Sequence, residues 1–188
     1  YVENFLYMLQ FPNEKSAGLM AAMKLFQILH YDHGGGNLSC FVGKAVASGL
    51  EHMYGAITAS ITALGGRRHG KANQDALDFL HQVLHCFGQN PSFQDLEMHL
   101  TKKIELGTLI PGFGHPVLRI EDPRASICYQ FCESHFPNHP LVKVALSMRS
   151  QAVRILKQYS KMHDPFPNID AISGVMLESA GFAYPPYL

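Results

Sequence analysis

The sequence predicts an all-α protein. Apolar residues recur at three- and four-residue steps through most of the chain, which is the spacing of a helix with one buried face. No segment alternates cleanly between apolar and polar residues, as a half-buried strand would. At 188 residues, of which 47% are hydrophobic, the chain is long enough for one generous domain or two small ones with a real core.

The spacing of apolar residues and the glycine-rich breaks between segments predict the first three helices. A helix over residues 16–30 ends at the glycine run 34–36, and a second is expected over 38–50. The apolar stripe of the first consists of Leu19, Met23, Phe26 and Leu29 or His30. A third helix, over 54–66 ("YGAITASITALGG"), has many small side chains on its surface. Because small residues let another helix approach closely, we expect this helix to be buried on several sides.

Residues that typically cap or end helices bound the next two helices. Residues 73–87 form a strongly one-sided helix that ends at Gly88. Its apolar face consists of Ala76, Phe79, Leu80, Val83, Leu84 and Phe87. A helix over 92–107 begins with Ser92 as its N-cap, and Asp95 lies in its first turn, where a negative charge suits the helix dipole.

Proline marks the start of the later helices. A helix over 122–136 begins with Asp122 as N-cap and Pro123 at the first helical position. A longer helix over 139–162 begins in the same way, and a last helix follows "PFPNID".

The charges balance, with 15 Lys and Arg against 15 Asp and Glu, which argues against nucleic acid or an anionic membrane as partner. No apolar run approaches the roughly 20 residues of a membrane helix, and no secretory leader opens the chain, so it is expected to be soluble and not exported. Because it begins at Tyr1 and ends without a helix cap, we expect a segment of a longer polypeptide.

The arginines are concentrated near two loops. Four of the six lie within ten residues of His69 or His115, which predicts a small anionic ligand. They are Arg67, Arg68, Arg119 and Arg124.

The four cysteines are expected to be reduced thiols, because a chain with this much core does not need disulfides. Cys128, Cys132 and His135 would share one helical face and could suggest a metal. Three ligands without a fourth favour buried thiols instead.

Three histidines lie beside glycine in breaks between helices: His33, His69 and His115. A fourth break, "DPFPNIDAISG", presents Asp170 at the start of the last helix. Each alone could be a cap or a loop-stabilising residue. Their joint occurrence points to a site.

Two chemistries could use this set. His30 and His33, with His69 or Asp32, could bind zinc in a hydrolase. Alternatively, neutral imidazoles, a carboxylate base and arginine anchors could perform acid–base catalysis on a carboxylate substrate. The second explains the arginines, whereas cations close to a divalent metal would repel it.

The motifs "NFLYML", "LHYDHGGGN", "HGKANQDAL", "PGFGHPVLRIEDPR" and "PNIDAISGVML" occur together, in this order, over nearly the whole chain. In this combination the chain resembles the citrate synthases, and the form "PGFGH...LR...DPR" is closest to the mitochondrial type. The resemblance implies a homodimeric all-α acyltransferase of the tricarboxylic acid cycle, whose two domains close over oxaloacetate and then acetyl-CoA. It implies that residues 1–70 belong to the large domain, 71–181 form the small domain, and 182–188 start the return to the large domain.

The resemblance also implies the catalytic residues. Asp170 matches the base that removes a proton from the acetyl methyl group. His69 matches the neutral histidine that donates a hydrogen bond to the thioester carbonyl, and His115 matches the one that polarises the oxaloacetate carbonyl.

Binding residues are implied in the same way. His33 and Arg124 match positions that hold oxaloacetate, and Arg119 matches a position that contacts a phosphate of coenzyme A. No cofactor is bound permanently, acetyl-CoA is a co-substrate, and no metal is needed. The location would be the cytoplasm of a bacterium or the mitochondrial matrix of a eukaryote.

Departures from the family pattern leave alternatives open. "GGRRHG" has arginines where many relatives have small or apolar residues, and Pro116 and Ile172 are unusual at their positions. Two further arginines that bind substrate in the family lie beyond residue 188. A 2-methylcitrate synthase that uses propionyl-CoA, and a non-catalytic fragment that binds CoA, are therefore the alternative functions.

Overall fold

A computed structural model describes residues 1–10, 16–31, 34 and 36–182, and within these residues it contains helices and no strand. The predicted all-α class is confirmed. The helices are α1 (Val2–Met8), α2 (Ser16–His30), α3 (Leu38–Ser48), α4 (Met53–Leu64), α5 (Lys71–Phe87), α6 (Phe93–Glu105), α7 (Pro123–His135), α8 (Pro140–Tyr159), the 3₁₀ turn η2 (Ile169–Ala171) and α9 (Ser173–Ser179).

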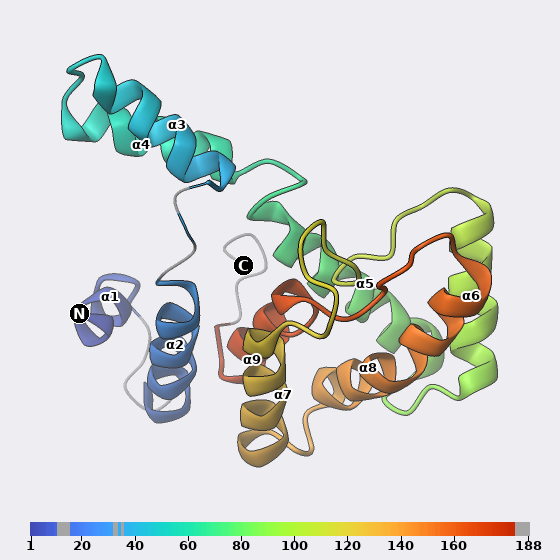
Figure 1. The fold of residues 1–188 in the computed structure, drawn as a ribbon. Helices are drawn as coiled ribbons and strands as arrows, with labels where there is room; N and C mark the ends of the chain where they lie inside the picture. Colours follow the sequence, from blue (N-terminus) through green and yellow to red (C-terminus); the bar gives the residue numbers. More distant parts are fainter. Residues whose placement is uncertain (11–15, 32–33, 35, 183–188) are drawn as a thin grey trace.

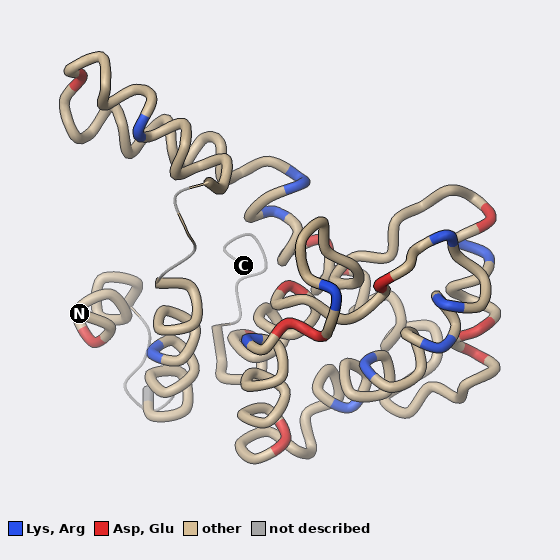
Figure 2. Tube along the Cα trace, viewed as in Figure 1, with Lys and Arg blue, Asp and Glu red and all other residues tan. Residues whose placement is uncertain are grey.

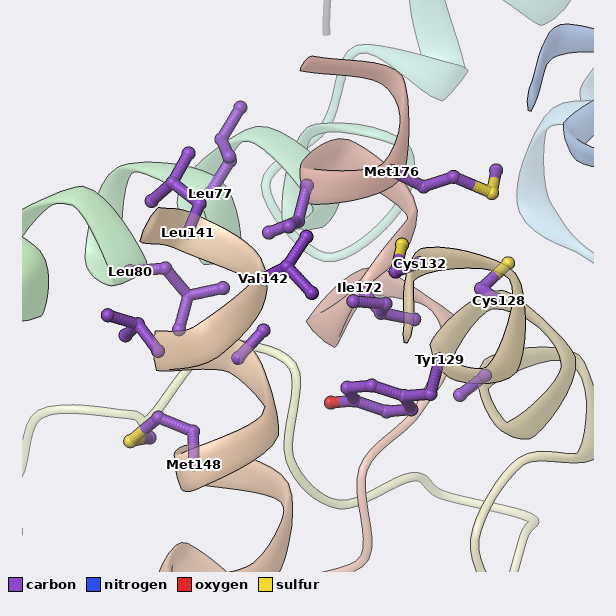
Figure 3. Close-up of a cluster of buried hydrophobic side chains, with 14 of the residues drawn as sticks. Leu77, Leu80, Cys128, Tyr129, Cys132, Leu141, Val142, Met148, Ile172 and Met176 are labelled. Atoms are coloured by element: carbon purple, nitrogen blue, oxygen red, sulfur yellow. The ribbon is translucent and has the colours of Figure 1, made fainter. Parts of the chain in front are cut away.

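The core lies where α5, α7, α8 and α9 meet, with α6 packed against α8 and α2 against α9 (Figure 1). The long helix α8 runs through its centre and is buried over most of its length, as its one-sided apolar pattern requires. Buried side chains from these helices interdigitate in Figure 3, among them Leu77, Leu80, Tyr129, Leu141, Val142, Met148, Ile172 and Met176.

The predicted helix starts are confirmed where capping residues mark them. Ser92 accepts a hydrogen bond from the backbone N–H of Asp95, whose side chain accepts one from the N–H of Ser92, forming a complete capping box. Asp122 caps α7, and Pro123 occupies its first helical position. Each of these caps involves only residues within three positions of the helix start, so the sequence alone predicts it.

The prediction that the helix over 54–66 is buried on several sides is wrong. Among the described residues of this single chain, α4 packs extensively on α3 alone, and neither helix has a buried residue. Its small residues serve one close contact: a Cβ on Gly43 of α3 would lie 2.1 Å from Oγ of Ser60. The pair forms a hairpin that projects from the rest of the molecule (Figure 1).

Two features were not predicted in detail. Helix α1 overlaps the motif "NFLYML" but has no capping signal of its own: its N-cap, Tyr1, makes no side-chain hydrogen bond. The last helix is divided into η2 and α9, because the side chain of Asn168 caps a 3₁₀ turn at Asp170. No helix among the described residues is both long and apolar enough to cross a membrane.

Candidate active site

The loop that carries His115 and the segment that leads to Asp170 are joined by backbone hydrogen bonds. The N–H of Gly114 donates to the carbonyl of Phe166 (2.9 Å), and the N–H of Asn168 donates to the carbonyl of Gly112 (2.9 Å). Phe113 and Pro167 form an isolated antiparallel bridge between them. The two loops therefore act as one unit, although they are about 50 residues apart in the sequence.

Glycine is required in this loop for two reasons. Gly112 and Gly114 have φ values of 80° and 81°, a region that L side chains rarely adopt. A Cβ on Gly112 would also lie 2.7 Å from Cα of Ala171, inside the turn that carries Asp170. Any side chain at residue 112 would therefore displace the Asp170 turn.

Hydrogen bonds fix the tautomer of neutral His115. Its Nδ1 accepts from the backbone N–H groups of Val117 and Leu118, each at 3.0 Å. A nitrogen that accepts N–H donors carries no proton, so the neutral ring has its proton on Nε2. His115 is thus prepared to donate a hydrogen bond from Nε2 to a ligand.

Arg119 is mostly exposed and folds back on its own loop. Its guanidinium donates to the carbonyls of His115 (3.5 Å) and Pro116 (3.2 Å), and its Nε lies 3.7 Å from a carboxylate oxygen of Asp164. These contacts hold a cation at the outer edge of the paired loops, where it could meet an anionic group in solution.

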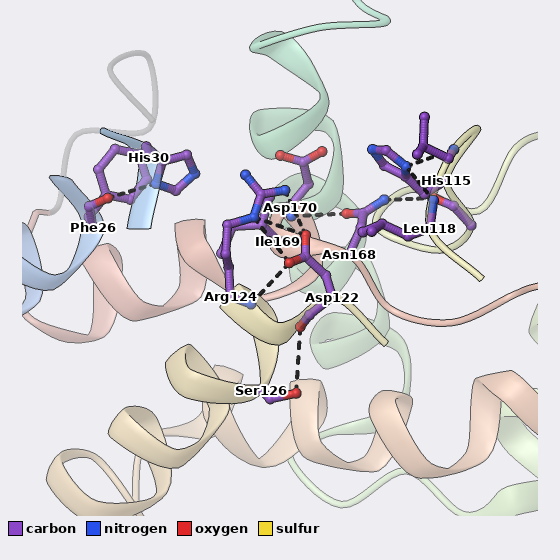
Figure 4. A network of polar contacts seen from close by, with 12 residues as sticks. Phe26, His30, His115, Leu118, Asp122, Arg124, Ser126, Asn168, Ile169 and Asp170 are labelled. Carbon is purple, nitrogen blue, oxygen red and sulfur yellow. Dashed lines mark hydrogen bonds and ion pairs between the residues drawn. The ribbon is translucent and has the colours of Figure 1, made fainter. Parts of the chain in front are cut away.

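Arg124 is held by a buried carboxylate. Asp122, 1% exposed, accepts from the backbone N–H of Arg124 (3.0 Å) and from its guanidinium Nη2 (2.7 Å) and Nε (3.0 Å). It also accepts from the N–H of Ile169 at 3.2 Å. Burial alone would raise the pKa of Asp122, but the hydrogen bonds and charge of Arg124 outweigh it and hold that pKa below its usual value. Asp122 thereby ties the arginine to the turn that carries Asp170 (Figure 4).

Asp170 lies beside Arg124 in Figure 4 and is partly buried. Burial raises the pKa of its carboxyl to about 6; the positive charge of Arg124 opposes this rise and the negative charge of Asp122 adds to it. A carboxylate with a pKa near neutrality is a stronger base than a solvated one, and it is still ionised at pH 7 to 8. Asp170 therefore has the properties of a general base.

His69 lies in the turn between α4 and α5, next to the hairpin. The backbone N–H of Ser39 donates to its Nε2 at 3.3 Å, and Oγ of Ser39 lies 2.8 Å from the same nitrogen. The neutral ring therefore has its proton on Nδ1, which becomes the donor. The neighbouring Arg67 is highly exposed, and its Nε lies 3.6 Å from Asp75.

The turns that follow His69 and Asp170 are packed together. α5 begins directly after His69 and packs against η2 and α9. The hydroxyl of Ser173 at the start of α9 donates to the side chain of Asn73 in the first turn of α5 (3.0 Å). The structure therefore brings Asp170, Arg124 and His115 together and holds the start of α5 against them, while His33 lies outside the described residues.

The metal alternatives gain no support. Among residues 1–10, 16–31, 34 and 36–182, no three His, Cys, Asp or Glu side chains are grouped to hold a metal. His30 stacks on Phe26 and bonds to its carbonyl oxygen (2.7 Å), whereas Asp32 and His33 lie outside the described residues. Cys128 and Cys132 are buried as predicted, and burial raises the pKa of both thiols.

Sequence reasoning missed two residues that hold the site. Ser39 orients His69 from 30 positions away, and Asn168 bonds both to the Asp170 turn and to Gly114. The available signals were weak: an Asn two residues before a turn is a common Asx cap, and Ser39 follows the glycine run by three residues.

The site can now be compared with known proteins. A family model described as citrate synthase, C-terminal domain, matches residues 1–187. The mitochondrial citrate synthase of Citrus maxima is 36% identical over 187 residues, covering 100% of this chain and 39% of that protein. The mitochondrial 2-methylcitrate synthase of Yarrowia lipolytica is 32% identical over 187 residues, covering 100% of this chain and 40% of that protein.

A solved structure agrees with the sequence matches. The citrate synthase of Thermoplasma acidophilum, in a ternary complex with carboxymethyl coenzyme A and oxaloacetate, aligns with a TM-score of 0.70 at 27% identity, over 91% of this chain and 42% of that one. The chain thus spans about two fifths of the length of these proteins. Since the family model covers all but the last of its residues, the chain belongs to the citrate synthase family.

Proposed function

We propose that the protein containing this chain condenses acetyl-CoA with oxaloacetate to give citrate and CoA. The observation that carries the proposal is a set of three groups whose surroundings suit this reaction. Asp170 is a partly buried carboxyl with a pKa of about 6, and His69 and His115 each accept backbone N–H donors at one ring nitrogen. The Thermoplasma acidophilum relative, whose complex contains oxaloacetate and carboxymethyl coenzyme A, supports these substrates.

In the first step Asp170 removes a proton from the methyl group of acetyl-CoA. Negative charge develops on the thioester oxygen, which accepts a hydrogen bond from Nδ1 of His69. A placed donor in a site shielded from water stabilises this oxygen far more than bulk solvent would, typically by about 3 kcal/mol. Ser39 keeps the donor nitrogen protonated, because it occupies the other nitrogen of the ring.

In the second step the carbon of this hydrogen-bonded enolate attacks the ketone carbon of oxaloacetate. The ketone oxygen becomes an alkoxide and takes up the proton that Nε2 of His115 donates. The citryl thioester is then hydrolysed by water, which releases CoA. Throughout, Arg124 and His33 would hold the oxaloacetate carboxylates and Arg119 would contact a phosphate of CoA.

The test is release of free CoA by the complete polypeptide in which residues 1–188 occur. We expect release from acetyl-CoA that requires oxaloacetate and yields one citrate for each CoA. Omitting oxaloacetate is the control for simple thioester hydrolysis. No release with either acetyl-CoA or propionyl-CoA would contradict the proposal and favour a protein that only binds CoA.

The second candidate is a 2-methylcitrate synthase, which the Yarrowia lipolytica relative favours. One additional methylene changes binding in an apolar pocket by only about 1–3 kcal/mol, so the loops described above are equally suited to both substrates. The ratio of kcat/KM for propionyl-CoA and acetyl-CoA decides between them.

The division into a large domain before residue 70 and a small domain over 71–181 is part of the proposal, as is a homodimer formed through the hairpin of α3 and α4. Two features of the hairpin support self-association. Its large apolar residues are exposed, and its only charged side chains are Lys44 and Glu51 (Figure 2). An uncharged apolar surface of this kind is typical of an obligate interface.

Charging the outer face of α4 is expected to separate the subunits. Ile57 and Ile61 lie one turn apart and are 47% and 63% exposed, so replacing both with glutamate places the new charges at the surface of the single chain. Light scattering should show the complete polypeptide falling to half its mass. The control is Leu109→Glu, at an exposed residue distant from the hairpin. A double variant that keeps the unaltered mass would contradict the interface.

A further inference from the structure

The side chain of Asn168 bonds to both catalytic loops at once (Figure 4). Its Oδ1 accepts from the backbone N–H of Asp170 at 2.9 Å, and its Nδ2 donates to the carbonyl of Gly114 at 2.9 Å. Its own N–H donates to the carbonyl of Gly112. One residue thus bonds to the proposed base and to the residue directly before His115.

Only a side-chain amide of this length satisfies both partners. The partner on one side is an N–H donor, and the partner on the other side is a carbonyl acceptor, so the amide must present its oxygen to Asp170 and its nitrogen to Gly114. A carboxylate at residue 168 would repel the Gly114 carbonyl. A serine could cap the turn at Asp170 but could not reach Gly114.

The bond from Asn168 to the carbonyl of Gly114 adds to the backbone pairs at the point where the His115 loop turns. Gly114 has a φ of 81°, a conformation that needs support from its surroundings, and His115 follows it directly. The 3₁₀ turn that carries Asp170 is held at two backbone N–H groups. The side chain of Asp122 accepts from the N–H of Ile169, and the side chain of Asn168 accepts from the N–H of Asp170. Removing the Asn168 amide would loosen the His115 loop at Gly114 while leaving the backbone pairs and the Asp122 bond in place.

We propose that Asn168 is a positioning residue that keeps His115 aligned with Asp170, so that the enol formed at one group meets the ketone held by the other. The inference rests on the function proposed above. Asn168 touches neither reacting atom. It acts through the distance between the two groups, and a misplacement of about 1 Å can lower a rate about 100-fold.

Two substitutions separate the two bonds. Asn168→Ser keeps an oxygen that can accept from the N–H of Asp170 and loses the bond to Gly114. We expect exchange of the acetyl methyl protons with solvent, measured with a non-reacting analogue of oxaloacetate, to stay within about threefold of the unaltered protein. CoA release should fall about 10- to 100-fold in kcat with little change in KM.

Asn168→Asp has nearly the same shape but places a second carboxylate beside Asp170. Like charges raise the pKa of a carboxyl, so both proton exchange and CoA release should fall, and the acidic limb of the pH profile should move to higher pH. The control is Ser92→Ala, which removes a helix cap far from the site and should lower the melting temperature without changing kcat. A loss of kcat in Asn168→Ser no larger than in this control would overturn the inference.

Amide hydrogen exchange tests the coupling without any assay of turnover. In Asn168→Ser the amides of residues 112–115, 117 and 118 should exchange at least tenfold faster, whereas those of 169–172 should change little. Unchanged exchange at the first set of residues would overturn the inference. If the unaltered protein releases no CoA, the proposed function fails, and the exchange measurement still decides whether Asn168 couples the two loops.

Discussion

Replacing Asp170 with asparagine is expected to abolish most of the turnover and, at the same time, to stabilise the folded protein. The amide cannot accept the methyl proton, and loss of a positioned base typically costs about 10²- to 10⁴-fold in rate. Asn and Asp have the same size, so the 3₁₀ turn that carries the residue should be preserved. The loss should therefore appear in kcat, with little change in the KM for oxaloacetate.

The stabilisation follows from the direction of the pKa shift. Burial raises the pKa of Asp170 from 3.8 to about 6, so the folded state holds this proton more tightly than the unfolded state. Below pH 3.8 both states are protonated and the carboxyl imposes no penalty. As the pH rises through 6, the folded state must hold a buried charge, which costs at most about 3 kcal/mol.

Thermal unfolding at two pH values tests this sign. The Asp170→Asn protein should melt at a higher temperature than the unaltered protein at pH 8, and at nearly the same temperature near pH 4. Asp78→Asn makes the same chemical change at an exposed carboxylate on α5 and should alter neither property. An Asp170→Asn protein that is less stable at pH 8, or one that keeps its turnover, would show that Asp170 is neither strained by burial nor the base.

The helices were predictable because their signals are local. Ser92 and Asp122 lie at the starts of α6 and α7 as expected, since an N-cap bonds only to residues two or three positions away. The glycine-rich break around His115 was also correctly predicted to lie between helices, and Gly112 and Gly114 lie within it. These features depend on a few neighbouring residues and on no long-range contact.

The exposure of α4 and the supporting bonds could not be predicted in this way. Small residues on α4 indicate close packing but not which helix supplies it, and here α3 alone does so. Ser39 orients His69 across 30 residues, and Asn168 reaches Gly114 across 54. Such pairs form only when the whole chain has folded, so each side chain by itself looks like an ordinary cap.

Asp122→Asn is expected to be the most damaging conservative change at a residue outside the three proposed catalytic groups. The amide keeps the shape of the side chain but cannot accept both guanidinium donors, so Arg124, only 22% exposed, loses its counter-charge. Removing one partner of a buried ion pair typically costs about 3–5 kcal/mol. Glu121→Gln is a matched control at the adjacent residue, because Glu121 pairs with Arg149 at a more exposed position and should cost less.

The same variant tests the electrostatic arrangement of the site. The negative charge of Asp122 raises the pKa of Asp170, while the positive charge of Arg124 lowers it. Asp122→Asn removes the negative charge that raises this pKa and leaves the positive charge of Arg124 to lower it further. The pKa of Asp170 should therefore fall, and the acidic limb of the kcat–pH profile should move to lower pH. Glu121→Gln should leave the limb in place. If the limb stays near pH 6 in Asp122→Asn while the melting temperature falls, the titrating group that controls turnover is a residue other than Asp170.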